Sequence, residues 1–306
     1  MSLFCKVCDK PFKSDKGLHI HVSRTHKIEI GEYYVNFYQR KDRYNNKLLP
    51  FKNKSDYFSL DFKNRKNFLA WVEEADPEEV KEYILKQLQR RIEEKGLRYA
   101  PAHIELELHG LPSLEVYKRF FGSYSKACNK LKIEPLFDKK IMEGFFQEDH
   151  SLDSVKVLVD TREQQPLKFK RSMKMKLDFG DYAVGAPHYD YTYVDRKSGP
   201  DFKSTMTTGF NRFVNELKRA EDFDAYLFIV VESSIEKIKQ QNIFGPHRSN
   251  LPYIWHNMRV LAHMFPRQCQ FIFTGTRGAS EEIIPKLLVY GKKLWRTDLQ
   301  YFIDKQ

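Results

Sequence analysis

Residues 180–202, GDYAVGAPHYDYTYVDRKSGPDF, carry the clearest information about the fold. The aromatic middle of this stretch has the composition of a β-strand, and consecutive side chains on a strand point to opposite faces of a sheet. Asp195 and Lys197 are two residues apart, so they are expected on one face, with Arg196 on the other. The stretch therefore predicts a carboxylate and a cation at one site near the end of a strand.

A second carboxylate is expected at the same site. Asp181 follows Gly180, and glycine permits turns that are closed to other residues, so Asp181 can lie beside Asp195. Two carboxylates, a substrate phosphate and water suit Mg²⁺ or Mn²⁺, which prefer oxygen ligands. The metal would activate a bound water, and Lys197 would orient that water or shield the phosphate. Taken alone, Asp-x-Lys is too short to indicate a site, and a solvated strand edge is the commoner source of this pattern.

The sequence around this stretch alternates between strands and helices, which predicts a C-terminal α/β domain over residues 150–306. Strands are expected at 155–160, 189–197, 225–232 and 269–275, with helices at 210–217, 253–265 and 279–294. Acidic residues fall at strand ends, and Asp160 is one of them.

Four segments occur in a specific order: VDTREQ (159–164), GDY (180–182), VDRKSGPD (194–201) and NRFVNEL (211–217). Together they resemble the XPF-type structure-specific nuclease domain of the PD-(D/E)XK superfamily. The signature of that family is Gly-Asp, a variable gap, Glu-Arg-Lys, three residues and Asp, and here Asp195 stands at the glutamate position. The resemblance implies a restriction-endonuclease-like fold and a Mg²⁺-dependent endodeoxyribonuclease that has DNA as its partner.

The resemblance also implies roles for single residues. Asp181 and Asp195 would bind the metal, Asp160 would be a further acidic member, and Lys197 would be the catalytic cation. Supporting residues, which would orient ligands, contact phosphate or cap the next helix, are Arg162, Glu163, Arg196 and Asp201. The family often pairs its nuclease domains, so a homodimer through this domain is a further expectation.

The N-terminal stretch FCKVCDKPFKSDKGLHIHVSRTH has the ligand spacing of a zinc site. Two residues separate Cys5 from Cys8, twelve separate Cys8 from His21, and four separate His21 from His26. Two thiolates and two imidazoles so spaced can converge on one Zn²⁺. Residues 1–30 closely resemble the C2H2 zinc fingers, which implies a ββα fold that needs the metal because its own core is small.

The partner of this finger is left open by the sequence. The positions at which C2H2 fingers contact bases hold Ser14, Gly17 and Ile20, and none of these makes a bidentate contact to a base edge. Lys13 and Lys16 are instead expected to hold DNA phosphates, and docking of a protein partner is the alternative.

Two further segments lie between the finger and the α/β domain. Residues 31–75 interleave aromatic and basic side chains, which could stack bases; a small aromatic core is the favoured alternative. Residues 76–140 resemble the helical repeat found beside homing endonucleases, which implies DNA binding, with a structural spacer as the alternative. Helix caps are expected at Asp76, Gly96, Ser113 and Ser123.

Charge and composition set the remaining expectations. The 306 residues carry a formal net charge of +11, and both ends are basic around a near-neutral middle, which favours a polyanionic partner such as DNA. Few cysteines, no signal peptide and no long apolar run predict an intracellular protein, cytoplasmic or nucleoid-associated, with no membrane partner. The expected enzyme is a nuclease for branched DNA, as in repair or recombination, or a site-specific, homing-like one. A catalytically silent DNA-binding scaffold is the alternative.

Overall fold

The structure, a computed structural model, describes residues 3–244 and 248–306. Contacts group the chain into two compact units, Met1–Tyr83 and Ile84–Gln306. The finger and the aromatic segment share the first unit, and most of the helical segment shares the second with the α/β domain. This grouping differs from the four segments expected from the sequence. Within the described ranges, no helix has both the length and the apolar character needed to cross a membrane.

The first unit begins with the expected order of two strands and a helix. Strand β1 (Leu3–Phe4) pairs antiparallel with β2 (Pro11–Phe12), and α1 (Asp15–His21) follows with Ser14 as its N-cap. A π-helical turn, η1 (Val22–His26), continues α1. The unit also contains α2 (Ile30–Phe37), α3 (Lys54–Ser59) and α4 (Arg65–Glu74).

The core of the first unit joins the finger to the aromatic segment after it. Leu18 and Val22 of the finger are buried in one cluster with Tyr33, Tyr34, Leu49 and Tyr57. The ring of Tyr34 also stacks on that of Phe51, with 4.8 Å between the ring centroids. Because aromatic rings bury large apolar areas, these tyrosines enlarge a core that the finger alone could not form. The aromatic core favoured from the sequence is therefore present.

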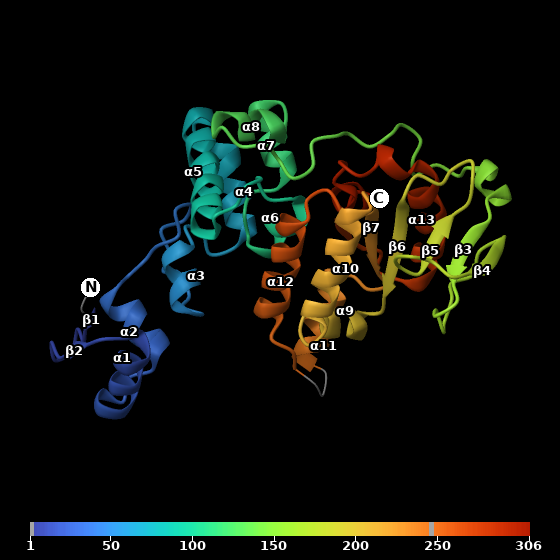
Figure 1. Ribbon diagram of the computed structural model, residues 1–306. Helices are drawn as coiled ribbons and strands as arrows, with labels where there is room; N and C mark the ends of the chain where they lie inside the picture. Colours follow the sequence, from blue (N-terminus) through green and yellow to red (C-terminus); the bar gives the residue numbers. More distant parts are fainter. Residues whose placement is uncertain (1–2, 245–247) are drawn as a thin grey trace. The chain divides into compact units, whose positions relative to one another are not determined.

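A mixed six-stranded sheet lies at the centre of the second unit, in the order β4-β3-β5-β6-β7-β8. The strands are β3 (Val157–Asp160), β4 (Ser172–Met175), β5 (Tyr182–Val184), β6 (Thr192–Lys197), β7 (Tyr226–Val231) and β8 (Cys269–Phe273). Strand β5 is antiparallel to both of its neighbours, whereas the other pairs are parallel (Figure 1). The α/β expectation is confirmed, and the sequence analysis missed β4 and β5.

Helices cover both faces of this sheet. One buried cluster involves α9 (Gly199–Thr205), α10 (Phe210–Asp222), α11 (Ile235–Phe244) and α12 (Leu251–Met264). The other involves α13 (Arg277–Tyr290) and α14 (Leu299–Ile303), and two short 3₁₀ turns, η2 (His150–Ser154) and η3 (Gly291–Lys293), flank the domain. The apolar faces of α12 and α13 are thus used within the chain, and a homodimer stays a prediction.

The helices that precede the sheet are α5 (Pro77–Lys95), α6 (His103–Leu108), α7 (Leu114–Phe121) and α8 (Tyr124–Lys130). Their expected boundaries are present: the Asp76 carboxylate accepts from the N–H groups of Glu78 and Glu79, and Gly96 has φ +59°. The hydroxyl of Ser123 caps α8, whereas Ser113 begins α7 without a side-chain hydrogen bond.

Helix α6, which the sequence did not predict, connects these helices to the sheet. Ile104 packs in the same buried cluster as α10 and α12. Oε1 of the buried Glu105 accepts from Nε and Nη2 of Arg91 at 3.0 and 2.9 Å. Its Oε2 lies 3.1 Å from Nε2 of His263, on α12. Glu105 of α6 thus connects Arg91 of α5 to His263 of α12 within the second unit.

Candidate active site and metal centre

Gly180 creates the turn that places Asp181 beside β6. Its φ is +58°, and a Cβ at this position would lie 2.6 Å from the carbonyl oxygen of Val194. The N–H of Asp181 donates to that same oxygen at 2.8 Å. Only glycine combines this left-handed backbone with so close an approach to the neighbouring strand. The expected turn is therefore present, for the expected physical reason.

Asp195 and Lys197 point to one face of β6. Nζ of Lys197 donates to Oδ1 of Asp195 at 3.0 Å and lies 2.8 Å from Oδ2. The side chain of Lys197 is 13% exposed and that of Asp195 is 9% exposed. The ammonium of Lys197 also lies 5.0 Å from the centre of the Phe213 ring. The lysine is thus held in a largely dry position with its charge directed at the carboxylate.

The pocket holds more negative charge than Lys197 compensates. Burial and the neighbouring Asp195 raise the pKa of Asp181 to about 8, even though the N–H of Arg196 donates to Oδ2 of Asp181 at 2.7 Å. Burial and Asp195 also raise the pKa of Glu216, on α10. A divalent cation bound by these carboxylates would remove the mutual repulsion that raises both pKa values.

These groups line an open pocket of about 410 Å³ between the sheet and α10. Its walls comprise Asp160, Arg162, Asp178, Gly180, Asp181, Asp195, Lys197, Arg212, Asn215, Glu216 and Arg219. Within residues 3–244 and 248–306, no three acidic groups bring their ligand atoms within 4.8 Å of one another. Asp181 and Asp195 therefore suit a Mg²⁺ site with two carboxylate ligands. Water and oxygens of the substrate would complete the coordination shell.

Glu216 is a pocket residue that the sequence analysis did not assign. It lies in the quoted segment NRFVNEL, but nothing in the spacing of that segment separates it from a solvated helix residue. The main chain of Gly180 lies near its carboxylate and partly offsets the rise in the pKa of Glu216, which places α10 beside the turn before Asp181. Only the folded chain brings these two segments together.

Asp160 is the most fully engaged carboxylate of the pocket. Oδ1 accepts from N and Nε of Arg162 at 2.8 and 2.6 Å, and Oδ2 accepts from Nη2 of Arg162 and N of Leu177 at 3.1 and 2.7 Å. Burial raises the pKa of Asp160, but these donors outweigh it and lower that pKa to about 2. The residue thus positions Arg162 and the chain after β4, and a direct catalytic role for Asp160 stays a prediction.

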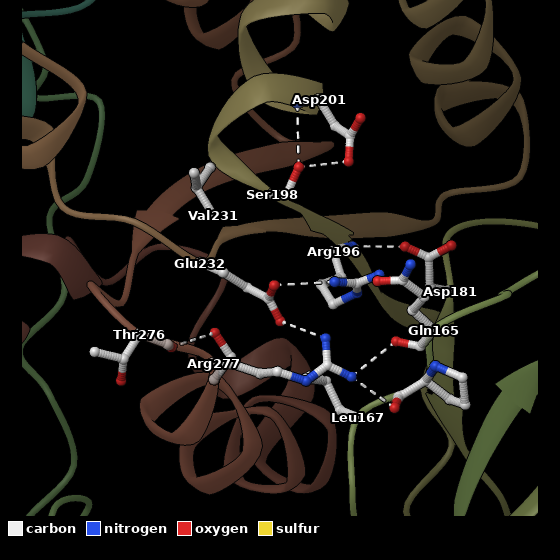
Figure 2. Close-up of polar contacts among 12 residues, drawn as sticks. Gln165, Leu167, Asp181, Arg196, Ser198, Asp201, Val231, Glu232, Thr276 and Arg277 are labelled. Carbon is white, nitrogen blue, oxygen red and sulfur yellow. Dashed lines mark hydrogen bonds and ion pairs between the residues drawn. The ribbon is translucent and has the colours of Figure 1, made fainter. Parts of the chain in front are cut away.

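Arg196 lies on the opposite face of β6, as expected, and is the centre of a buried ionic network. Its guanidinium is 3.2 Å from Glu163 and 3.0 Å from Glu232, and all three side chains are largely buried. Arg277, at the start of α13, extends the network to Glu232 and to the carbonyl of Gln165 (Figure 2). The sequence predicted Arg196 and Glu163 but not Glu232 or Arg277, since no local spacing links these positions.

Asp201 caps α9. The hydroxyl of Ser198 donates to Oδ2 of Asp201 at 2.5 Å, and the N–H of Asp201 donates to Oγ of Ser198 at 3.2 Å (Figure 2). This reciprocal pair satisfies donors at the start of the helix that directly follows Lys197. Helix capping was one of the supporting roles expected for Asp201, and its side chain does not line the pocket.

The four expected zinc ligands converge in the first unit. The ligand atoms of Cys5, Cys8, His21 and His26 all lie within 4.8 Å of one another. The Nε2 atoms of the two histidines are 3.2 Å apart and lie 3.3 and 3.4 Å from Sγ of Cys8. Two nitrogen ligands of a tetrahedral zinc ion are about 3.3 Å apart when each is about 2.05 Å from the metal. The cluster is therefore compatible with Zn²⁺.

The π-helical turn η1 brings the two histidines to one side. His26 is five residues after His21, and residues five apart diverge by about 140° on an α-helix, whereas a wider π turn returns them to one face. Oγ1 of Thr25 lies 3.1 Å from Nδ1 of His21, which leaves Nε2 to the metal. His19 is not a member of the cluster: it is half-buried, and its Nε2 lies 3.0 Å from Oη of Tyr34.

Lys13 and Lys16, the residues expected to hold phosphates, are both exposed on the finger. Exposure leaves them free to meet a polyanion, as it does most surface lysines, so their role stays a prediction.

The chain matches no protein-family model and no curated protein. Two solved structures of XPF from Aeropyrum pernix are similar to part of it. The one in complex with DNA has 20% sequence identity and a TM-score of 0.36, over 45% of this chain and 66% of that chain. The other has 21% identity and a TM-score of 0.35, over 45% of this chain and 67% of that chain. At this identity and TM-score, the likeness adds nothing to what the pocket residues support.

Proposed function

We propose that this chain is a metal-dependent DNA endonuclease that hydrolyses phosphodiester bonds in the pocket of Asp181 and Asp195. One observation carries this proposal. The carboxylates of Asp181 and Asp195 repel each other, and the largely buried Lys197 contacts Asp195. The four sequence segments that resemble the XPF-type nuclease domain all contribute to this pocket or to its immediate support. The geometry and the motif order thus support the same function.

In this proposal Asp181 and Asp195 hold Mg²⁺ or Mn²⁺. When bound, the metal lowers the pKa of a water molecule and neutralises charge on the phosphate. The ammonium of Lys197 donates one hydrogen bond to Asp195, and its two other N–H groups can donate to the attacking water or to a phosphate oxygen. The N–H of Arg196 keeps the Asp181 carboxylate oriented, so the ligands are held in place before substrate arrives.

The proposal gives Zn²⁺ a structural role in the first unit. Cys5, Cys8, His21 and His26 would hold the metal, and the buried tyrosine core would stabilise the finger further. The exposed Lys13 and Lys16 would contact DNA phosphates and help to position the substrate. A protein partner for the same surface is the alternative.

Two DNA substrates are consistent with the resemblances: branched DNA, such as a flap or junction, favoured by the nuclease motif, and a specific site, favoured by the helical repeat. A labelled panel of linear duplex, flap, fork, four-way junction and single strand, incubated with Mg²⁺, Mn²⁺ or EDTA, separates them. Branch-dependent cutting supports the first substrate, and cutting of a single duplex sequence supports the second.

The same panel tests the active site when Asp181→Ala and Lys197→Ala are compared with the intact chain. Glu236→Ala and Lys237→Ala are matched controls, because both residues are exposed on α11 and lie outside the pocket. Metal-dependent cutting that is lost in the first two variants and kept in the controls supports the proposal. Cutting that survives both pocket substitutions would overturn it.

A silent DNA-binding scaffold is the second candidate. Its specific support is that the ammonium of Lys197 lies within 3.0 Å of both oxygens of Asp195, where a cation would bind, and that aspartate replaces the signature glutamate. DNA binding without cleavage on every substrate and with every metal is the outcome that this candidate predicts.

A further inference from the structure

One face of α10 borders the pocket with four polar side chains. They are Arg212, Asn215, Glu216 and Arg219. These positions follow the first at three, four and seven residues, which is the repeat of a single helix face. The residues buried from the same helix are Phe213, Leu217 and Ala220, which pack on the sheet. The amphipathic pattern of α10 therefore directs two arginines to the rim of the pocket.

The two arginines are available to a ligand. Arg212 is exposed, and within the described ranges its guanidinium forms no hydrogen bond or ion pair. The guanidinium of Arg219 lies over the ring of Phe179, 5.5 Å from its centroid, which restricts its motion without using its hydrogen-bond donors. Arg162, the third arginine of the pocket, is by contrast bound to Asp160 through two of its nitrogens.

Charge is separated across the pocket. Asp181 and Asp195 face the pocket from the side of the sheet, whereas Arg212, Glu216 and Arg219 face it from α10. Asp178 is exposed at the same pocket, next to Phe179, over which the guanidinium of Arg219 lies. With two arginines and one glutamate, the α10 side carries a net positive charge that attracts a polyanion.

The spacing of the arginines fits an extended strand. Residues 212 and 219 are seven positions apart, which separates their Cα atoms by about 10.5 Å along the helix axis at about 1.5 Å per residue. The two side chains therefore leave the helix at two points along the pocket, and Glu216 lies between them on the same helix. A ligand with a single phosphate has no group for the second arginine.

We propose that Arg212 and Arg219 bind phosphates on the two sides of the scissile bond, so that the substrate is a polynucleotide strand lying along α10. This inference rests on the proposed function, which it narrows: a mononucleotide or a small phosphodiester would react without these contacts. The arginines are positioning residues for the strand and take no part in the hydrolytic step.

Kinetics on two substrates test this inference. Arg212→Gln, Arg219→Gln and the double variant are assayed on an oligonucleotide and on bis(4-nitrophenyl) phosphate, with Lys218→Gln, a neighbouring exposed α10 residue outside the pocket, as the matched control. The double variant is expected to raise KM for the oligonucleotide by about tenfold or more and to reduce the dependence on salt by about one phosphate contact per arginine. Hydrolysis of the small diester should change by less than about twofold.

Arg219→Lys refines the result, because it keeps a positive charge over Phe179 and should recover part of the oligonucleotide activity. Equal losses on both substrates, or a loss in Lys218→Gln as large as in the arginine variants, would overturn the inference.

A binding readout keeps the inference separable from the proposed function. The intact chain is treated with phenylglyoxal, which modifies arginine, in the presence of the oligonucleotide or of inorganic phosphate at the same phosphate concentration. Peptide mass mapping is expected to show protection of Arg212 and Arg219 by the oligonucleotide only. Protection without any hydrolysis would support strand binding while removing the nuclease proposal, and absence of protection would overturn strand binding whether or not the chain cuts DNA.

Discussion

The main-chain N–H of Arg196 donates a hydrogen bond to Oδ2 of Asp181 at 2.7 Å. The side chain of the same arginine points to the other face of the sheet, where it contacts Glu232 (Figure 2) and Glu163. One residue therefore orients a carboxylate of the pocket through its backbone and holds the underside of the site through its guanidinium. Damage to the network below β6 is thus expected to reach the pocket above it.

Gly180→Ala should destabilise the chain and displace Asp181. The new Cβ would meet the carbonyl of Val194 at 2.6 Å in a left-handed backbone, and we expect the free energy of unfolding to fall by ~2 kcal/mol or more. Urea unfolding measures the change. Gly185→Ala is the control, because nothing lies within 4 Å of its added Cβ, and it should be neutral or stabilising by up to ~1 kcal/mol. Equal stability of the two variants would count against the strain assigned to Gly180.

Asp181→Asn should change how stability depends on pH in EDTA. The folded-state pKa of Asp181 is about 8, whereas an unfolded aspartate titrates near 3.9, so the folded chain holds this proton longer. Ionisation of Asp181 therefore opposes folding, and its effect lowers the free energy of unfolding as pH rises from about 4 to about 8.

Asparagine removes this ionisation and can still accept the Arg196 N–H. Between pH 5.5 and 8, the wild-type chain should lose ~1 kcal/mol or more relative to Asp181→Asn, measured by urea unfolding in EDTA. Addition of Mg²⁺ should recover this lost free energy of unfolding in the wild type but not in Asp181→Asn. If the free energy of unfolding depends on pH in the same way in both proteins, the pKa of Asp181 is not raised by folding.

His21→Gln should remove zinc, and His19→Gln should retain it. Nε2 of His21 belongs to the convergent ligand set, whereas Nε2 of His19 is bound to Tyr34. Metal analysis after dialysis is expected to give stoichiometric zinc for the wild type and for His19→Gln, and little for His21→Gln. Thermal unfolding should show the matching loss of stability, since zinc binding is coupled to folding of the finger. Zinc lost equally in both variants would contradict the assigned ligand set.

Arg196→Met should destabilise the α/β domain by about 3–5 kcal/mol, because it leaves buried carboxylates unpaired. Arg90→Met is the matched control: Arg90 pairs with Glu94 on the exposed side of α5, where the two side chains are 40% and 51% exposed. Such surface pairs contribute about 0–1 kcal/mol. Chemical unfolding of both variants gives the comparison, and a similar small loss in each would mean that the Arg196 network does not hold the sheet.

Much of this fold was predictable because its signals are local. Helix α5 begins after Asp76, whose carboxylate caps it, and ends before Gly96, which has a positive φ. The spacing of cysteines and histidines from Cys5 to His26 identified every member of the ligand cluster. The alternation on β6 placed Asp195 and Lys197 on one face and Arg196 on the other. In each case the controlling interaction lies within a few residues or follows a fixed periodicity.

The remaining features depend on contacts between distant segments. Strand β4 has the sequence SMKM, in which polar and apolar residues alternate, but it has only four residues and is exposed along its whole length; β5 has only three residues, so both strand signals are weak. Glu216 reaches the pocket because α10 packs over the Gly180 turn, and Glu232 meets Arg196 from another strand end. The tyrosines that complete the finger core come from residues after it. No sequence spacing predicts these contacts between distant side chains.

We propose that Asp181 and Asp195 hold a divalent metal that promotes the hydrolysis of DNA. A single-turnover assay on the preferred DNA of the panel tests it, with Mg²⁺, Ca²⁺ or EDTA, for the wild type, Asp195→Asn and the surface control Glu236→Gln. We predict cutting with Mg²⁺ only, a loss of about 10³-fold or more in Asp195→Asn, and no change in the control. Cutting in EDTA, or an Asp195→Asn rate equal to that of the wild type, would contradict the account.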